Sequence, residues 1–207
     1  MGRSLAAWFL VTFAAASPAT APRDVVQIAL TRVVAVLESQ PDFDRGTHVD
    51  FAEKRRVEIR KIAADLFDYQ EMSRRALSRH WAAHTPSQHT EFVGLFTDLL
   101  ERSYVGRIEA FTGEKISIIG QSVDANYATV RSRITGKRRE TTLDYRLYLD
   151  DGRWRVYDIV IDGVSFVSTY RNEFDRVIRA SSYATLVERM KQKQLAVDAL
   201  PRQAAER

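Results

Sequence analysis

The stretch LDYRLYLDDGRWRVYDIVI, from Leu143 to Ile161, decides the fold class of this chain. Its first seven residues alternate between apolar and mostly polar side chains, which is the period of a half-buried β-strand. Asp150-Asp151-Gly152 is a hairpin signal, and Arg153–Ile161 reads as a second strand. One face of the first strand is apolar and carries Leu143, Tyr145, Leu147 and Leu149. The pattern therefore predicts a hairpin with one buried face.

Two more strands precede this hairpin, over Lys115–Gln121 and Tyr127–Ile134. The connections between the strands are too short for crossover helices, so we expect a four-stranded antiparallel sheet. Its second face carries Asp144 and Arg146 and should be at least half exposed to solvent.

Helical periodicity flanks the sheet on both sides. The predicted helices cover 22–40, 48–67, a short segment capped by Asp68, 85–111, 166–180 and 183–194. The helix that opens at Thr85-Pro86-Ser87-Gln88, a capping-box sequence, has the longest apolar face. We therefore predict an α+β fold with N-terminal helices, a curved sheet and C-terminal helices, with the helices packed on the apolar sheet face.

The amino-acid composition excludes several classes of function. The 207 residues contain no cysteine, which excludes disulfides, thiolate metal sites and cysteine nucleophiles. Basic side chains number 31 and acidic ones 27, an excess too small for a protein that binds nucleic acid mainly through phosphates.

The first residues have the pattern of an export signal. Arg3 precedes about a dozen apolar residues and then a stretch of small residues, which is typical of a secretory signal peptide and too short for a membrane span. We expect a signal peptide over 1–19, cleaved after Ala16 or Ala19, then one domain over 22–196 and a polar tail over 197–207. The mature chain would be exported and soluble.

No catalytic or metal motif is complete. Gly163-Val164-Ser165-Phe166-Val167 lacks the second glycine of a nucleophile elbow, so we expect Ser165 to cap a helix. His80 and His84 have metal-ligand spacing, but no glutamate lies between them. Phosphate-binding glycine loops are also missing from the sequence. We therefore predict no catalytic residue, no metal and no cofactor.

Aromatic-rich motifs carry the remaining information. Trp154–Phe166, Tyr170-Arg171 and Phe174 resemble the signature of the MlaC/toluene-tolerance family, in which a Trp-x-Val-Tyr-Asp strand leads through Gly-Val-Ser into a Tyr-Arg-x-x-Phe helix. Further motif residues follow the family order: Phe67-Asp68, Met72-Ser73, Ala76-Leu77, Trp81, Thr85, Gln88 and Phe92. The resemblance covers about 24–194. Ser78 stands in place of a usual glycine, and Asp162 in place of glutamate.

The resemblance implies a periplasmic phospholipid carrier. Such a protein moves lipid between an outer-membrane lipoprotein complex and an inner-membrane ABC transporter complex, and we expect it to be a monomer that binds no nucleic acid. The implied fold is a nuclear-transport-factor-like cone that holds acyl chains inside. A sister branch is associated with hopanoids, so the cargo could be hopanoid or phospholipid.

A carrier of this kind needs an apolar cavity. A diacyl lipid exposes on the order of 30 methylenes at about 0.8 kcal/mol each, so free lipid does not cross water at a useful rate. The candidate walls are the apolar sheet face (Leu143, Tyr145, Leu147, Leu149) and a helix stripe (Phe96, Leu99, Leu100, Tyr104, Ile108). Val164 and Phe166 would lie near the mouth.

Two other classes stay open. Cone folds also serve isomerases and dehydratases that use a pocket carboxylate, and Asp144 and Asp158 are the available candidates here. The third class is a periplasmic adaptor with a filled core and no cavity.

Overall fold

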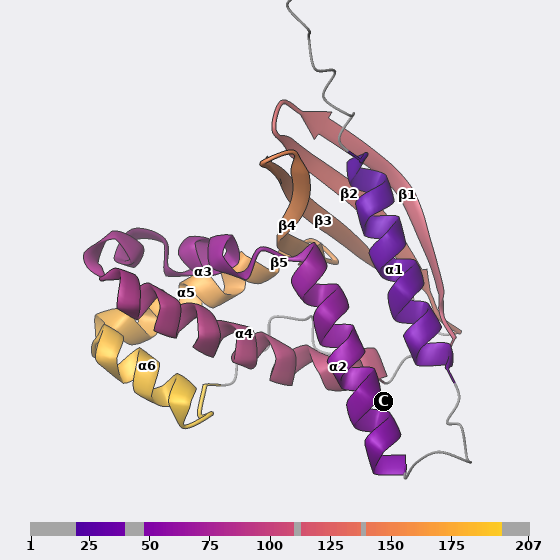
Figure 1. Cartoon of the computed structure of the whole chain (residues 1–207). Coiled ribbons are helices and arrows are strands. Elements are labelled where there is room, and N and C mark those ends of the chain that lie inside the picture. Colours follow the sequence, from indigo (N-terminus) through magenta and orange to yellow (C-terminus); the bar gives the residue numbers. More distant parts are fainter. Residues whose placement is uncertain (1–19, 40–47, 110–112, 138–139, 196–207) are drawn as a thin grey trace, which may run out of the picture.

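The computed structural model describes residues 20–39, 48–109, 113–137 and 140–195. Helices come first along the chain, then an antiparallel sheet, then helices again, which confirms the α+β class (Figure 1). The predicted signal peptide and polar tail lie outside the described residues. Within the described ranges, none of the helices combines the length and the apolar character that a membrane span requires.

The sheet has five strands in the order β1-β2-β3-β4-β5, so the expected count of four is wrong. The strands are β1 (Lys115–Asp124), β2 (Tyr127–Thr135), β3 (Glu140–Asp150), β4 (Arg153–Ile161) and β5 (Val164–Ser165). Asp162 and Gly163 have φ angles of 47° and 84° and turn the chain back, so that Val164 pairs with Ile161. A strand of two residues is too short to produce an alternation in the sequence.

Three helices begin after the caps that the sequence predicts at Asp68, Thr85 and Ser165. The helices are α1 (Pro22–Glu38), α2 (His48–Leu66), α3 (Tyr69–Leu77), the 3₁₀ helix η1 (Ser78–Ala83), α4 (Pro86–Glu109), α5 (Phe166–Ala180) and α6 (Tyr183–Lys191). Asp68 Oδ1 accepts from the Glu71 amide at 2.8 Å. Before α4, the Thr85 amide donates to Gln88 Oε1 at 2.9 Å and the Gln88 amide donates to Thr85 Oγ1 at 3.3 Å, which completes the capping box.

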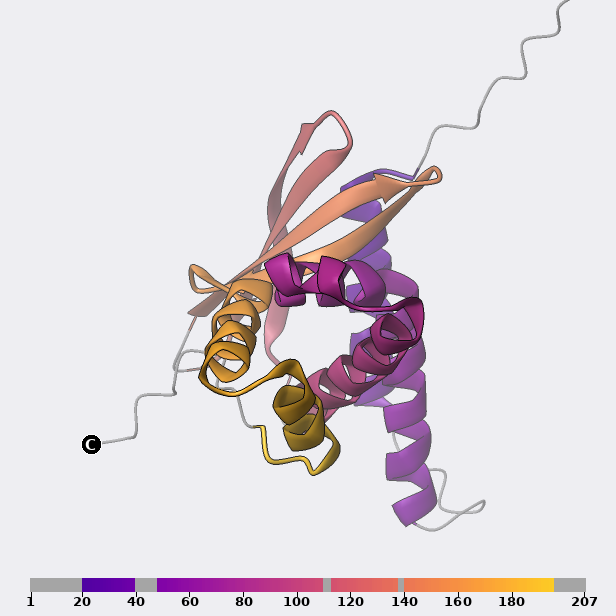
Figure 2. The same ribbon diagram turned by 90° about the vertical axis from the view of Figure 1, so that its left-hand side faces the viewer.

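The buried apolar residues form two clusters. The sheet cluster joins α1 and α2 to one face of the sheet (Figure 1). Its members are Val26, Ala29, Ile62, Leu66, Ala128, Val130, Tyr145, Leu147, Trp154 and Val156. The helical cluster joins α3, α4, α5 and α6, which gather on the side of the molecule seen in Figure 2. Its members are Met72, Ala76, Leu77, Phe92, Phe96, Leu99, Leu100, Phe166, Val167, Tyr170, Phe174, Val177, Leu186, Met190 and Leu195.

The two clusters correct the expectation that all helices pack on the apolar sheet face. That expectation holds for α1 and α2. Helices α4, α5 and α6 instead bury their apolar sides against one another and against α3. Aromatic rings from α4 and α5 pack together there: the Phe96 ring centroid lies 5.0 Å from that of Tyr170 and 5.4 Å from that of Phe174. Phe67 packs against both clusters and links them.

A bulge in the β3–β4 pair decides which way one carboxylate points. The register shifts between Arg146 and Leu147, so Leu147 faces Val156 while Arg146 faces Asp158. Residues directly opposite each other share a sheet face, so Asp158 lies on the polar face with Arg146 although Val156 belongs to the sheet cluster.

Candidate functional site

The predicted helix wall is packed in this structure. Four of its members are buried in the helical cluster: Phe96, Leu99, Leu100 and Phe166. Tyr104 packs against that cluster with its ring 4.2 Å from Phe166, and Ile108 is half-buried near the end of α4. The helix stripe and the start of α5 are therefore neighbours.

The predicted sheet wall lies in the other cluster. Tyr145 and Leu147 are buried in the sheet cluster, and Leu143 and Leu149 pack against it. The two walls are thus contributed by different clusters. Val164, expected at the mouth with Phe166, is 41% exposed on β5, whereas Phe166 is buried.

A polar cleft of about 430 Å³ lies between α3, η1, α5 and the polar face of the sheet. We call it the arginine cleft. Four arginines line it (Arg74, Arg75, Arg146 and Arg171), together with one carboxylate, Asp158, and the larger uncharged side chains Trp81, Tyr157 and Val167. The cleft is therefore electropositive and suited to bind an anion.

Asp158 is only 3% exposed and accepts three hydrogen bonds. They come from Arg146 Nη1 at 3.1 Å, Ser165 Oγ at 2.7 Å and the Val167 amide at 3.0 Å. These donors join β4 to β3 and to the first turn of α5. Because both carboxylate oxygens are occupied by such donors, the geometry favours a structural role for Asp158 over that of a catalytic base.

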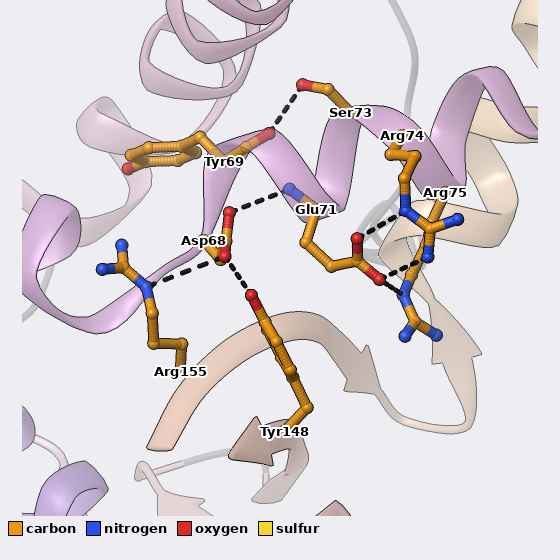
Figure 3. A network of polar contacts seen from close by, with 8 residues as sticks. All are labelled: Asp68, Tyr69, Glu71, Ser73, Arg74, Arg75, Tyr148 and Arg155. Atoms are coloured by element: carbon orange, nitrogen blue, oxygen red, sulfur yellow. Dashed lines mark hydrogen bonds and ion pairs between the residues drawn. The ribbon is translucent and has the colours of Figure 1, made fainter. Parts of the chain in front are cut away.

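Glu71 orders two of the cleft arginines (Figure 3). Its carboxylate accepts two hydrogen bonds from Arg74, both at 2.6 Å, and one from Arg75 at 2.7 Å. Burial alone would raise the pKa of Glu71, but the bonds from both arginines outweigh it and hold that pKa below its usual range. The Arg75 guanidinium also stacks 3.8 Å above the ring of Tyr157, so its position is fixed on two sides.

Arg171 is the least restrained of the four. Its guanidinium is exposed and donates to Ser168 Oγ at 3.1 Å. Within the part of the chain that the structure describes, no carboxylate forms an ion pair with it. Four arginines are thus balanced by only two nearby carboxylates, Glu71 and Asp158, so the cleft has an excess of positive charge.

The joint between α2 and α3 fixes one side of the cleft to the sheet (Figure 3). Tyr148 donates its hydroxyl to the carboxylate of Asp68, and Arg155 Nε pairs with the same carboxylate at 3.9 Å. Arg155 Nη2 also donates to the Phe67 carbonyl at 2.7 Å. The Asp68 amide donates to the Val156 carbonyl at 2.9 Å. Burial first, and then the Asp68 carboxylate, raise the pKa of Tyr148 above its ordinary value. These contacts hold the start of α3, and thus Arg74 and Arg75, against β4.

The other candidate chemistries find no support in the geometry. Ser165 caps α5 by accepting from the Ser168 amide at 3.1 Å, as expected. His80 pairs with Asp175 at 2.8 Å, and the His84 ring stacks 3.7 Å from Tyr183. Among the described residues, no three histidine or acidic side chains gather as a metal site would require. Asp144 is half-buried on β3.

The sequence reading missed the arginine cleft. Arg74, Arg75 and Arg171 stand within or beside the quoted motifs, and the strand alternation predicts Arg146 on the exposed sheet face. The sequence does contain one sign of the cleft, because α3 and α5 both carry arginine next to family motif residues. Which of these arginines meet depends on how α3, β3 and α5 pack, and a linear pattern does not contain that information.

Comparison with known proteins agrees with this fold. Among solved structures, a phospholipid-binding protein from Ralstonia solanacearum, determined in complex with a phospholipid, matches with a TM-score of 0.73 and 25% sequence identity. The match covers 84% of this chain and 97% of that protein. A family model described as MlaC protein matches residues 29–192. Since that match spans most of the chain and agrees with the motifs quoted above, the protein belongs to the MlaC family.

Proposed function

We propose that this protein binds a phospholipid and carries it through the periplasm. The observation that supports this most directly is its similarity, across 97% of the relative's length, to a protein determined with a phospholipid bound. In this proposal the carrier is a monomer exported by its signal peptide. It exchanges lipid with an inner-membrane ABC transporter complex and an outer-membrane lipoprotein complex and performs no chemistry on it.

We place the acyl chains between the helical and sheet clusters, inside a cone of sheet and helices. The predicted wall residues are divided between the two clusters, and three of them, Leu143, Leu149 and Tyr104, are only partly buried. An empty apolar cavity costs about 24 cal/mol per Å³, so a lipid-free chain gains stability by closing its walls together. Lipid entry then requires the two clusters to part, and among the described residues Phe67 packs against both.

Native mass spectrometry tests the proposal. The protein is purified gently from the periplasm of its own organism, and the bound lipid is then extracted and identified. We expect the mass of one diacyl phospholipid per chain. An extracted hopanoid would assign the protein to the sister branch, whereas a chain reproducibly free of lipid would refute the proposal.

Two tryptophan substitutions test the walls. We expect Leu99→Trp and Leu147→Trp to block lipid uptake while the protein stays folded, because a side chain that fills an openable space displaces the ligand. Leu186→Trp is the matched control, since Leu186 is equally buried but lies on α6, outside the proposed walls. There the larger side chain should overpack the core and destabilise the fold by about 1–3 kcal/mol or more. Normal lipid binding by both wall variants would show that the walls are assigned wrongly.

A further inference from the structure

We infer that the arginine cleft binds the phosphate of the lipid head group, an inference that rests on the proposed function. The cleft draws Arg74, Arg75, Arg146 and Arg171 from α3, β3 and α5 onto one concavity. A guanidinium presents parallel N–H donors in a planar fork that matches two phosphate oxygens. A phosphodiester carries one negative charge, and the cleft has the positive excess to receive it.

Three of these arginines are already held in position. Arg146 is anchored on the buried carboxylate of Asp158 at 3.1 Å, and Arg75 is held between Glu71 and the ring of Tyr157. Side chains ordered in advance lose little conformational freedom when a ligand binds. Arg74 lies on the rim, 53% exposed, and is held by its two hydrogen bonds to Glu71, whereas the exposed Arg171 can turn toward an entering anion.

The floor of the cleft favours a lipid over a wholly polar anion. Val167 lines the cleft and also belongs to the helical cluster, and Trp81 lines it and packs against the same cluster. A phosphate among the arginines would therefore lie within one side chain of the apolar interior. At about 430 Å³ the concavity has the size of a small-ligand pocket, whereas a protein partner needs a broad surface.

The test separates head-group recognition from tail binding. The probes are dihexanoyl phosphatidylglycerol, the matching dihexanoylglycerol that lacks the phosphate, and glycerol 3-phosphate that lacks the tails. Binding to the purified, lipid-stripped full-length mature protein is measured by calorimetry. We expect the phospholipid to bind at least tenfold more tightly than either partial probe. Raising the salt concentration should weaken binding of the two probes that carry a phosphate and leave the affinity for dihexanoylglycerol unchanged.

Two variants assign this preference to the cleft. Arg171→Gln and Arg74→Gln should each weaken phosphatidylglycerol binding about tenfold, the ratio that one charge-assisted hydrogen bond carries. Dihexanoylglycerol binding should stay within about twofold, which also reports that the variants are folded. Arg179→Gln is the matched control. Like Arg171→Gln it removes one positive charge from α5, but Arg179 is 70% exposed and lies outside the cleft lining.

The possible outcomes distinguish failure of the head-group inference from failure of the proposed lipid-binding function. If both dihexanoyl probes bind with equal affinity and the cleft variants change neither, the inference is wrong while lipid binding stands. If glycerol 3-phosphate binds as tightly as the lipid, the cleft is a site for free phosphate esters and the head-group assignment fails. If neither lipid probe binds, the proposed function itself fails.

Discussion

Replacing Asp158 with asparagine should destabilise the protein substantially. The side chain keeps its shape but loses its charge and one acceptor oxygen. In the native chain Oδ2 accepts from Arg146 and Ser165, and Oδ1 accepts from the Val167 amide. Whichever way the new amide is turned, its NH₂ group faces at least one donor that cannot accept a hydrogen bond.

The size of the effect follows from these contacts. A hydrogen bond to a charged group contributes roughly 1.5–3 kcal/mol, and a buried donor left unsatisfied costs about 1–3 kcal/mol. The amide can keep its oxygen on Val167 and let Ser165 reverse its hydroxyl, so only part of this cost is incurred. Arg146 is 44% exposed, so water replaces much of its share. We expect a net loss of about 3 kcal/mol in the free energy of unfolding, or roughly 6–12 °C in Tm for a chain of this size.

Urea unfolding at pH 7, followed by circular dichroism on lipid-free protein, measures this difference. Asp144→Asn is the matched control, since Asp144 lies on the same sheet face and is half-buried; it should change stability by less than about 0.5 kcal/mol. A loss below 1 kcal/mol for Asp158→Asn would refute the structural role argued here. It would also return Asp158 to the list of candidate pocket carboxylates.

Three further substitutions test individual contacts. The pKa of Glu71 is lowered from 4.5, so its contribution to stability is complete above that value and is lost as the pH falls through the depressed pKa; urea unfolding from pH 6 to 3 should show this loss in the native protein and not in Glu71→Gln. Ser182→Ala removes the N-cap of α6 and should cost about 1 kcal/mol in thermal unfolding, while Ser181→Ala, one residue earlier and also exposed, should cost much less. Tyr148→Phe removes only the hydroxyl that donates to Asp68 and should cost about 1–2 kcal/mol by urea unfolding; an unchanged midpoint would mean that this bond does not hold α3 against the sheet.

Local features of the fold were predictable because their causes are local. The Asp68 cap, the capping box at Thr85 and the Ser165 cap each depend on residues within three positions of one another, and all three form as predicted. The β3–β4 hairpin has the expected strand ends at Arg153 and Ile161 for the same reason. Strand alternation and helical period are repeated many times along a segment, so a single exception does not hide them.

Long-range features were not predictable in this way. Strict alternation along β4 would place Asp158 on the face of Trp154 and Val156, and only the bulge opposite Arg146 moves it to the other face. A bulge depends on how two strands pair, and neither strand alone records it. The division of the apolar residues into two clusters likewise depends on which helices find each other.

The order of residues along the chain thus determined the class of fold, the first residue of most elements and membership of the MlaC family, because each of these is written in spacing and short motifs. Tertiary packing alone decided that Arg74, Arg146 and Arg171, from three separate elements, surround one cleft, and that the two predicted walls belong to different clusters. The physical reason is that charge and apolar surface act through space, so their effect depends on which segments the fold brings within a few ångströms of one another.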